Sequence, residues 1–226
     1  MLVRITAVLA PEQLSSMRAR LNGAAWVDGR VTAGHQAALS KSNLQLAHDD
    51  ALGQKLSDEV LRALERSALF VSAALPRHVY PPLFNRYESG MTFGAHIDNA
   101  VRQIPGTSHR LRTDLSATLF LTSPEEYDGG ELLIEDTYGP QSIKLAAGDL
   151  VVYPSSSIHR VLPVTRGTRT AAFFWIQSMV RDDGARALLH ELDTSIRELA
   201  RDGARNDALV RLTACYHNLL RRWADL

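Results

Sequence analysis

The chain has 226 residues, of which 45% are hydrophobic and 22% charged, and its 25 basic and 25 acidic residues cancel at pH 7. This length suffices for one domain with its own core plus a small appendage, and the balanced charge excludes the basic footprint of a typical nucleic-acid-binding protein. No apolar run approaches the ~20 residues that span a bilayer. We therefore expect neither nucleic acid nor membrane as a partner.

The cysteine content points to a reducing compartment. Cys215 is the single cysteine, which excludes an intrachain disulfide. The apolar stretch at residues 1–10 is interrupted by Arg4 and is too short for a signal-peptide core. We therefore expect a cytoplasmic protein. Leucines at helical spacing around Cys215 predict a buried structural thiol rather than a nucleophile.

Residues 1–80 predict a strand and helices that support a core further along the chain. Pro11 suits the first turn of a helix, and Gly23 follows that helix as a stop signal. In chain order the pattern predicts a strand at residues 2–9, a helix at 11–22, an irregular connection at 26–34, a half-buried strand at 42–46 and a helix at 50–74. The last helix would carry one apolar stripe, formed by Leu52, Leu56, Val60, Leu64 and Ala68.

From residue 81 the pattern changes to short β-rich runs separated by turns. Asp128-Gly129-Gly130 predicts a hairpin turn with residues 131–135 as the returning strand. The other predicted strands are at residues 82–87, 93–98, 114–122, 141–145, 149–153, 158–164 and 168–177. Many short strands without interleaved helices are typical of an antiparallel double-sheet barrel. The expected fold class is α+β, with a double-stranded β-helix (jelly-roll) core on which the N-terminal helices pack.

After residue 181 the pattern predicts a pair of amphipathic helices. Asp182-Asp183 can cap the first and Asn206 or Asp207 the second. The stripe of the first helix is Leu188, Leu189, Leu192, Ile196 and Leu199. We favour a packing layer on the barrel over an oligomer contact, although the helical ends would permit a homo-oligomer. The chain thus divides into a support region (1–80), a jelly-roll core (81–181) and a C-terminal helical extension (182–226).

His96 and Asp98 are the first candidate metal ligands. Two positions apart in a predicted strand, they share one face, with Cα atoms roughly 6.5 Å apart. The alternative is a surface strand with solvated side chains. In a double-sheet barrel distant strands line one mouth, which makes His159 the candidate third ligand. Two histidines and one carboxylate form the facial triad of non-haem Fe(II) oxygenases, which leaves metal positions open for substrates.

Arg169 lies in an apolar and aromatic strand, where an unpaired guanidinium is costly to bury. The position therefore predicts a carboxylate partner, which the planar fork of arginine grips with two charge-assisted hydrogen bonds. An internal ion pair with Asp114 or Glu131, or exposure on an edge strand, is the alternative.

Together these residues resemble the Fe(II)- and 2-oxoglutarate-dependent dioxygenases of the prolyl-hydroxylase superfamily, which carry a jelly-roll core, an H-x-D pair, a distal histidine and a basic residue beyond it. The bacterial PKHD-type hydroxylases are more similar still, through the runs RTDLSATLFL (112–121), YDGGEL (127–132) and FWIQSMVR (174–181).

The resemblance implies a site and a reaction. His96, Asp98 and His159 would bind Fe(II) as the catalytic centre, and Arg169 would hold the far carboxylate of 2-oxoglutarate. Tyr87 is a second candidate for a hydrogen bond to this co-substrate, or else a core tyrosine. With O2, 2-oxoglutarate would be decarboxylated to succinate and CO2 while a substrate C–H bond is hydroxylated. L-Ascorbate is the expected reductant.

The substrate is the least determined part of the prediction. Residues 99–113, which follow the H-x-D pair, carry Arg102, His109, Arg110 and Arg112 and can meet an anionic group at the mouth or form a solvated loop. The resemblance suggests a peptidyl proline, or a siderophore-related small molecule linked to bacterial iron uptake. A cupin-like metal-dependent isomerase or hydrolase, and a non-catalytic metal-binding barrel, are the alternative functions.

Overall fold

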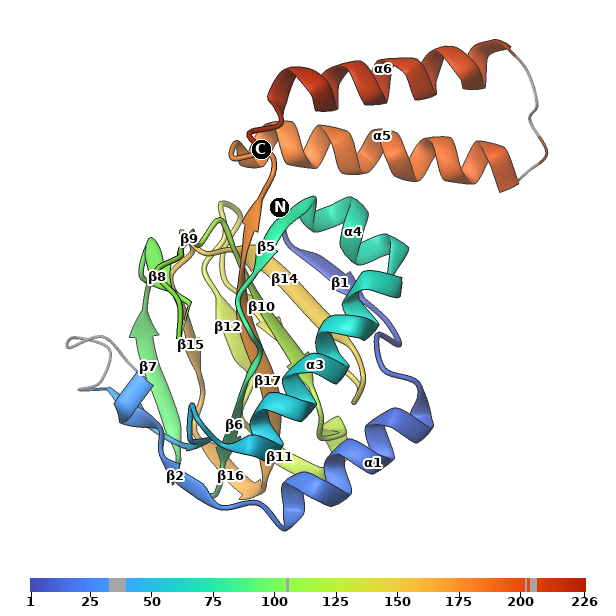
Figure 1. Cartoon of the computed structure of the whole chain (residues 1–226). Coiled ribbons are helices and arrows are strands. Elements are labelled where there is room, and N and C mark those ends of the chain that lie inside the picture. The colour runs from blue at the N-terminus through green and yellow to red at the C-terminus, as the bar shows by residue number, and fades with distance from the viewer. Residues whose placement is uncertain (33–39, 105, 202, 204–206) are drawn as a thin grey trace.

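Two antiparallel sheets face each other, and helices cover the outer face of the larger sheet (Figure 1). The computed structural model describes residues 1–32, 40–104, 106–201, 203 and 207–226. These residues form five α-helices: α1 (Pro11–Asn22), α3 (Ala51–Arg66), α4 (Ala68–Ala74), α5 (Asp183–Arg201) and α6 (Asp207–Trp223). The predicted α+β class is confirmed. No helix of the described residues has the length and apolar character needed to cross a membrane.

The strands of each sheet come from distant parts of the chain. The larger sheet runs in the order β1 (Val3–Ile5), β14 (Leu150–Pro154), β10 (Leu115–Phe120), β17 (Arg169–Ser178), β6 (Leu83–Tyr87), β4 (Leu44–Leu46) and β2 (Trp26–Asp28), and β5 (Pro76–Val79) pairs with the end of β17. The smaller sheet runs in the order β13 (Gln141–Ile143), β12 (Leu132–Ile134), β15 (His159–Val161), β7 (Thr92–His96) and β3 (Lys41–Ser42). Two ribbons complete the strands, β8 (Val101–Gln103) with β9 (Arg110–Arg112) and β11 (Tyr127–Gly129) with β16 (Val164–Gly167).

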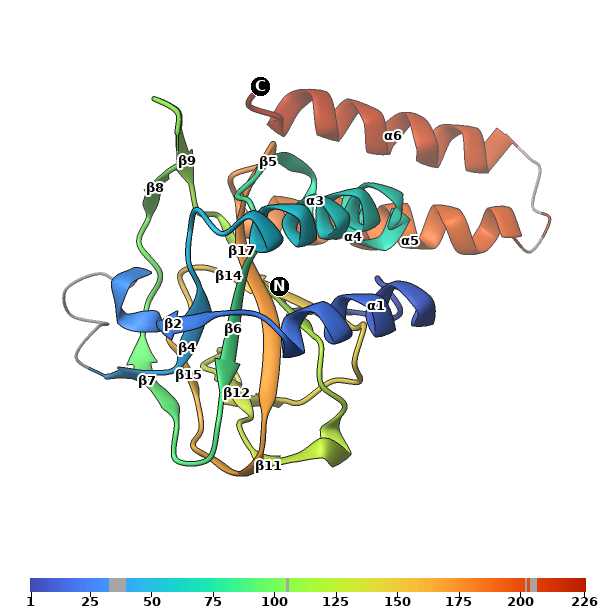
Figure 2. The same ribbon diagram turned by 60° about the horizontal axis from the view of Figure 1, so that its bottom comes forward.

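The central strand β10 is covered on both faces, because helices lie on one side of the larger sheet and the smaller sheet on the other. Leu115, Ala117 and Leu119 belong to the core under α1, α3 and α4, which lie on the same face in Figures 1 and 2. Successive side chains of a strand point to opposite faces. Ser116 and Thr118 therefore point between the sheets, where both are buried. Polar and apolar residues therefore alternate along β10, and the polar face lines a pocket instead of facing solvent.

The N-terminal third differs from the prediction in several places. The strand expected at residues 42–46 is divided at Asn43 into β3 and β4, which belong to different sheets. The helix expected at residues 50–74 is broken at Ser67, whose extended backbone ends α3 and whose side chain accepts a hydrogen bond from the Phe70 backbone N–H at 3.3 Å to begin α4. Ala68 consequently leaves the apolar stripe and is exposed. The connection expected at residues 26–34 contains β2 and a 3-10 helix (Gly29–Thr32), and its residues 33–34 lie outside the described residues.

The predicted hairpin at Asp128-Gly129-Gly130 is wrong. β11 pairs with β16, whereas the following strand β12 pairs with β13 and β15 of the smaller sheet. Gly129 and Gly130 both have positive φ, 69° and 68°, which favours glycine. A Cβ on Gly129 would lie 2.1 Å from the Pro163 carbonyl oxygen. The two glycines therefore redirect the chain from the ribbon into the smaller sheet instead of reversing it.

The C-terminal helices form a hairpin that projects beyond the two sheets (Figure 1). Asp182 caps α5 by accepting a hydrogen bond from the Ala185 N–H at 2.7 Å, as predicted, and the alternative cap Asn206 lies outside the described residues. α5 packs on α6 and on α4, so the predicted packing layer covers a helix and not the barrel. Cys215 is exposed, contrary to prediction, and does not belong to the apolar cluster that α6 forms with α5.

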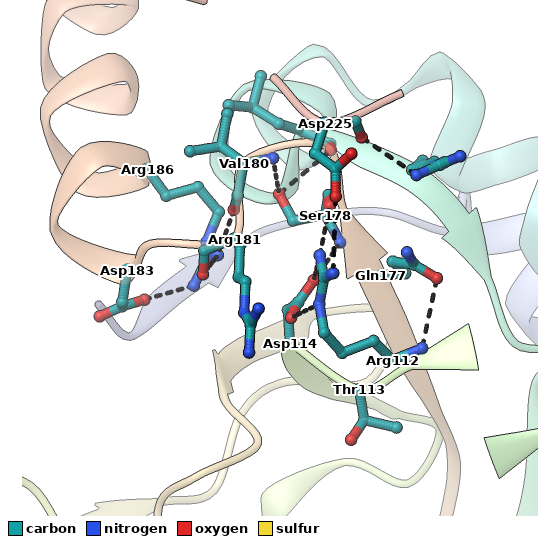
Figure 3. A network of polar contacts seen from close by, with 12 residues as sticks. Arg112, Thr113, Asp114, Gln177, Ser178, Val180, Arg181, Asp183, Arg186 and Asp225 are labelled. Carbon is teal, nitrogen blue, oxygen red and sulfur yellow. Dashed lines mark hydrogen bonds and ion pairs between the residues drawn. The ribbon is translucent and has the colours of Figure 1, made fainter. Parts of the chain in front are cut away.

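A polar network ties this hairpin to the sheets (Figure 3). Asp114 binds Arg112 through two hydrogen bonds of 2.6 and 3.0 Å and accepts a third, of 2.9 Å, from the Ser178 N–H. Arg186, 1% exposed, donates to the Val180 carbonyl oxygen at 2.7 Å and to a carboxylate oxygen of Asp183 at 2.6 Å. The network joins the start of β10, the ribbon strand β9 and the chain segment that leads into α5.

Candidate active site

A hollow that opens to solvent lies between the two sheets. Its wall contains all five candidate residues predicted from the sequence: Tyr87, His96, Asp98, His159 and Arg169. The exposed residues Ile97 and Asn99 lie at its mouth, and Arg169, 1% exposed, lies at its buried end. Folding therefore brings the five residues into one site.

His96, Asp98 and His159 converge on one point. Each offers a ligand atom within 4.8 Å of the other two, and His159 Nε2 lies 3.6 Å from Asp98 Oδ2. The two histidines face each other across the paired strands β7 and β15. One detail of the prediction is wrong, because β7 ends at His96 and Asp98 lies beyond the strand. The carboxylate reaches the cluster from the segment that follows, where the strand's geometry no longer constrains it.

Both histidines are oriented through their Nδ1 atoms. His96 Nδ1 lies 2.8 Å from the Gly94 carbonyl oxygen, and His159 Nδ1 lies 3.0 Å from the Ser157 carbonyl oxygen. Since a carbonyl only accepts, each Nδ1 carries the proton and each Nε2 keeps its lone pair for the cluster. Burial, followed by the nearby His159, lowers the pKa of His96 to about 4, so this ring is neutral at physiological pH. Neutral imidazole is the form that binds a metal.

Asp98 is held by a pair of serines that the sequence analysis did not identify. Ser116 Oγ donates to Asp98 Oδ2 at 2.6 Å, and Ser155 Oγ lies 2.7 Å from Ser116 Oγ. Because the single hydroxyl proton of Ser116 goes to the carboxylate, Ser155 must donate to Ser116. The inward direction of Ser116 on β10 was the available signal, but the strand's polar face was not recognised as a pocket wall.

Arg169 is a buried cation in the pocket wall. Its Nε and Nη1 atoms are buried and have no hydrogen-bond partner among the described residues. Its guanidinium lies over the rings of Tyr87 and Phe120, 5.3 and 5.2 Å from their centroids. The alternative ion pairs do not form, since Asp114 binds Arg112 and the Glu131 carboxylate lies 3.9 Å from Lys144 Nζ. Such a site calls for an anion from outside the chain.

Tyr87 lies beside Arg169, its direct partner on the neighbouring strand β6. The side chain is 1% exposed, and burial raises the pKa of its hydroxyl, so the group stays protonated and able to donate. Tyr87 is thus a core residue that also lines the pocket.

Two further polar residues line the pocket without having been predicted. Asn43 and Asn85 are 3% and 7% exposed. Both side-chain polar atoms of Asn43, and Oδ1 of Asn85, lack a hydrogen-bond partner within the described part of the chain. In the run at residues 42–46, alternation placed Asn43 on the polar face, which we took for the solvent side. The amides add neutral donors and acceptors to the wall between Arg169 and the mouth.

Comparison with known proteins identifies the family. Residues 82–177 match the 2OG-Fe(II) oxygenase superfamily, and residues 183–225 match the PKHD-type hydroxylase C-terminal domain. A PKHD-type hydroxylase of Xanthomonas campestris pv. campestris is 60% identical over 228 residues, covering 100% of both chains. One from Burkholderia ambifaria is 59% identical over 227 residues, again with 100% of both chains covered. The chain belongs to the PKHD-type hydroxylases. It is therefore a 2-oxoglutarate-dependent non-haem iron dioxygenase, whose family cofactors are Fe(II) and 2-oxoglutarate.

Solved structures with the same fold are more distant in sequence. A prolyl-4-hydroxylase from Pseudomonas putida superposes with a TM-score of 0.51 at 20% identity, over 78% of this PKHD-type hydroxylase and 92% of that chain. HygX from Streptomyces hygroscopicus, solved with nickel and 2-oxoglutarate bound, gives 0.52 at 14% identity over 78% and 82% of the two chains. These similarities concern the fold alone.

Proposed function

We propose that the chain hydroxylates a substrate C–H bond, with Fe(II) on His96, Asp98 and His159 and 2-oxoglutarate anchored by Arg169. The observation that carries this proposal is the pairing, in one pocket, of the His-Asp-His cluster with a buried arginine whose Nε and Nη1 atoms lack a hydrogen-bond partner in the described chain. Two imidazole nitrogens and one carboxylate oxygen are a donor set that suits Fe(II) and leaves open positions. When bound, the iron supplies oxygen activation coupled to decarboxylation of 2-oxoglutarate to succinate and CO2.

The residues of the chain bind, orient and exclude water. The Gly94 and Ser157 carbonyls hold the imidazoles with Nε2 toward the metal position. Arg169 offers its fork to the far carboxylate at the buried end, and Tyr87 adds a protonated hydroxyl beside it. The aromatic and aliphatic wall around Arg169 keeps that end dry, which strengthens both interactions. The site therefore fixes the co-substrate at one end and leaves the mouth for the substrate.

Three finer assignments belong to the same proposal. The two facing sheets form the double-stranded β-helix that the sequence predicted. L-Ascorbate keeps the iron reduced. The substrate is a peptidyl proline or a small molecule connected with bacterial iron uptake, and the prolyl-4-hydroxylase from Pseudomonas putida, which shares the fold, makes the first of these worth testing.

An anaerobic titration tests the assignment of the metal site. Apoprotein is titrated with Fe(II) and then with 2-oxoglutarate while the weak visible charge-transfer band of the chelate is followed. We expect the band in wild type and its loss in His159→Ala. His190→Ala is the matched control, because His190 is also a buried histidine but bonds Ser72 at the α4–α5 contact; this variant should keep the band.

Failure of the chelate would contradict the proposal directly. If metal binds but no band forms on adding 2-oxoglutarate, a cupin-like isomerase or hydrolase site becomes the better description. Loss of the band in both histidine variants would mean that it reports folding and not ligation.

Replacing Ser116 by alanine should weaken metal binding without unfolding the protein. The hydroxyl is the only hydrogen-bond donor to the Asp98 carboxylate within the described chain, and groups that orient a metal ligand typically contribute 10–100-fold in affinity. We expect the Kd for Mn(II), measured by the loss of its free EPR signal, to rise by about tenfold or more. Ser72→Ala, which removes a buried serine far from the pocket, is the control. An unchanged Kd in Ser116→Ala would show that Asp98 is positioned by other means.

A further inference from the structure

Two basic side chains line the pocket that contains the His-Asp-His cluster, each over an aromatic ring of the same pocket wall. The guanidinium of Arg102 lies 3.7 Å from the centroid of the Trp175 ring, and Lys41 Nζ lies 5.2 Å from that of Phe93. Both residues line the same hollow as the cluster. Nothing in the proposed binding of Fe(II) and 2-oxoglutarate uses either of them.

Arg102 is placed beside the reacting centre by strand pairing. It lies on β8, and Trp175 is the direct neighbour of Ser116 across β17 and β10. Ser116 in turn binds Asp98. The Trp175 ring therefore separates the Arg102 guanidinium from Ser116, the residue of β10 that holds the candidate metal ligand Asp98. None of the ion pairs among the described residues involves Arg102, although its side chain also lies near Tyr80, 5.6 Å from that ring.

Four basic residues were candidates for the pocket mouth: Arg102, His109, Arg110 and Arg112. The structure places Arg102 in the pocket wall. Arg112 is held by Asp114. His109 and Arg110 are exposed and do not line the pocket. Only Arg102 of the four does, because it and its pairing partner Leu111 lie on the ribbon's inner face, where Leu111 is fully buried.

Lys41 approaches the cluster from the other side. It pairs with Phe93 across β3 and β7, and the Phe93 ring stacks on His96 with 3.6 Å between centroids. Lys41 is 7% exposed; burial, then the positive charge of Arg102, lowers its pKa to about 8. Lys41 and Arg102 thus place two like charges in the wall of one pocket. An anion bound there would offset both charges.

The charges of the loaded site point to an anionic substrate. Asp98 is the only carboxylate that lines the described pocket, against the basic residues Lys41, Arg102 and Arg169. The charges of Fe(II) and Arg169 offset those of Asp98 and the 2-oxoglutarate dianion, which leaves the wall around the mouth positive. Asp28, whose charge also reaches Lys41, is already bound by Arg30, with 2.8 Å between Nε and Oδ2.

We propose that Arg102 and Lys41 bind a carboxylate of the substrate, so that the C–H bond to be hydroxylated belongs to an organic acid or an acidic peptide. This inference rests on the proposed function, because it takes the cluster as the reacting centre. The fork of Arg102 suits a carboxylate, and its stacking on Trp175 fixes the fork before the substrate arrives. The rings of Phe93, Phe173 and Trp175 complete the wall for the apolar part of the substrate.

Paired acids and amides test the charge preference on the complete chain. The protein is loaded with Mn(II) and saturating 2-oxoglutarate, and phenylacetate, indole-3-acetate and N-acetylproline are each compared with their primary amides. Relaxation of the probe protons by the metal reports both affinity and proximity to the centre. We expect the affinity for each acid to be at least about tenfold higher than the affinity for its amide, since charge-assisted hydrogen bonds are roughly twice as strong as neutral ones.

Variants assign the preference to Arg102. In Arg102→Gln the acids should lose about tenfold in affinity and bind no better than the amides, and Lys41→Gln should reduce the preference in the same direction. Arg110→Gln removes the same charge from the neighbouring ribbon strand outside the pocket and should behave as wild type. A proline peptide with an adjacent aspartate, compared with its asparagine form, separates a peptidyl acid from a small one.

Several outcomes would overturn the inference. The first two are equal binding of acids and amides, and no binding of any acid. The third is a preference for acids that survives Arg102→Gln. The fourth is loss of the Fe(II) chelate band when the acids are added, which would mean that they displace 2-oxoglutarate. Failure of the proposed function itself is distinguishable, since the wild-type protein would then form no chelate band before any probe is added.

Discussion

Replacing Arg169 by methionine is expected to weaken 2-oxoglutarate binding by about a hundredfold or more while leaving the metal-free protein as stable as wild type or more stable. Hydrogen bonds to charged groups contribute about 1.5–3 kcal/mol each, and the variant removes two that close on one carboxylate. In the free protein, however, Nε and Nη1 of this buried side chain have no partner among the described residues. An apolar side chain of similar length removes that cost.

The opposite directions of the two effects make the experiment decisive. Affinity is measured from the Fe(II) chelate band, and stability from thermal unfolding without ligands. Arg186→Met is the matched control: Arg186 is also 1% exposed, but it bonds Asp183 and the backbone near the start of α5. This variant should lose stability and keep its affinity for 2-oxoglutarate. If Arg169→Met instead destabilises the free protein and binds the co-substrate normally, Arg169 is a structural residue.

The sequence predicted those site residues whose spacing or chemical type stood out from the pattern around them. His96 and Asp98 were found by their spacing, and the structure brings them together even though Asp98 lies past the end of β7. Arg169 was found because a charge in an apolar strand needs an explanation. The signal was the spacing in the first case and the residue type in the second, and a single sequence can reveal both.

The remainder of the site depends on tertiary structure that the pattern does not encode. Ser116 and Asn43 are polar residues at alternate positions, and alternation alone cannot distinguish a pocket from solvent. The same limit explains the errors in the fold. Gly129 and Gly130 have the composition of a hairpin turn, yet the partner of each strand is decided by contacts with β16 and β13. Ser67 interrupts an apolar stripe that periodicity alone would continue.

The buried ion pair at the base of the β8–β9 ribbon should contribute far more to stability than an exposed pair of nearly identical geometry. Asp114 binds Arg112 at 2.6 and 3.0 Å, and Asp128 binds Arg166 at 2.6 and 3.1 Å. The Asp114 side chain is 7% exposed and the Asp128 side chain 57%. Solvent screens the second pair, whereas the first also accepts the Ser178 N–H.

We therefore expect Asp114→Ala to lower the free energy of unfolding by roughly 2–4 kcal/mol, because it removes two charge-assisted hydrogen bonds to Arg112 and leaves the Ser178 N–H without its acceptor. We expect Asp128→Ala to change the free energy of unfolding little. Urea unfolding of the two variants measures the difference. The Asp114→Ala substitution should also affect the pocket, since Arg112 and Arg102 lie on paired strands of one ribbon. If Asp114→Ala also erodes the preference for acids over amides while Asp128→Ala does not, the network that anchors the C-terminal hairpin also positions the residue that we assign to the substrate. Equal effects of the two substitutions on stability would show that the contacts of Asp114 are no stronger than those of a surface pair.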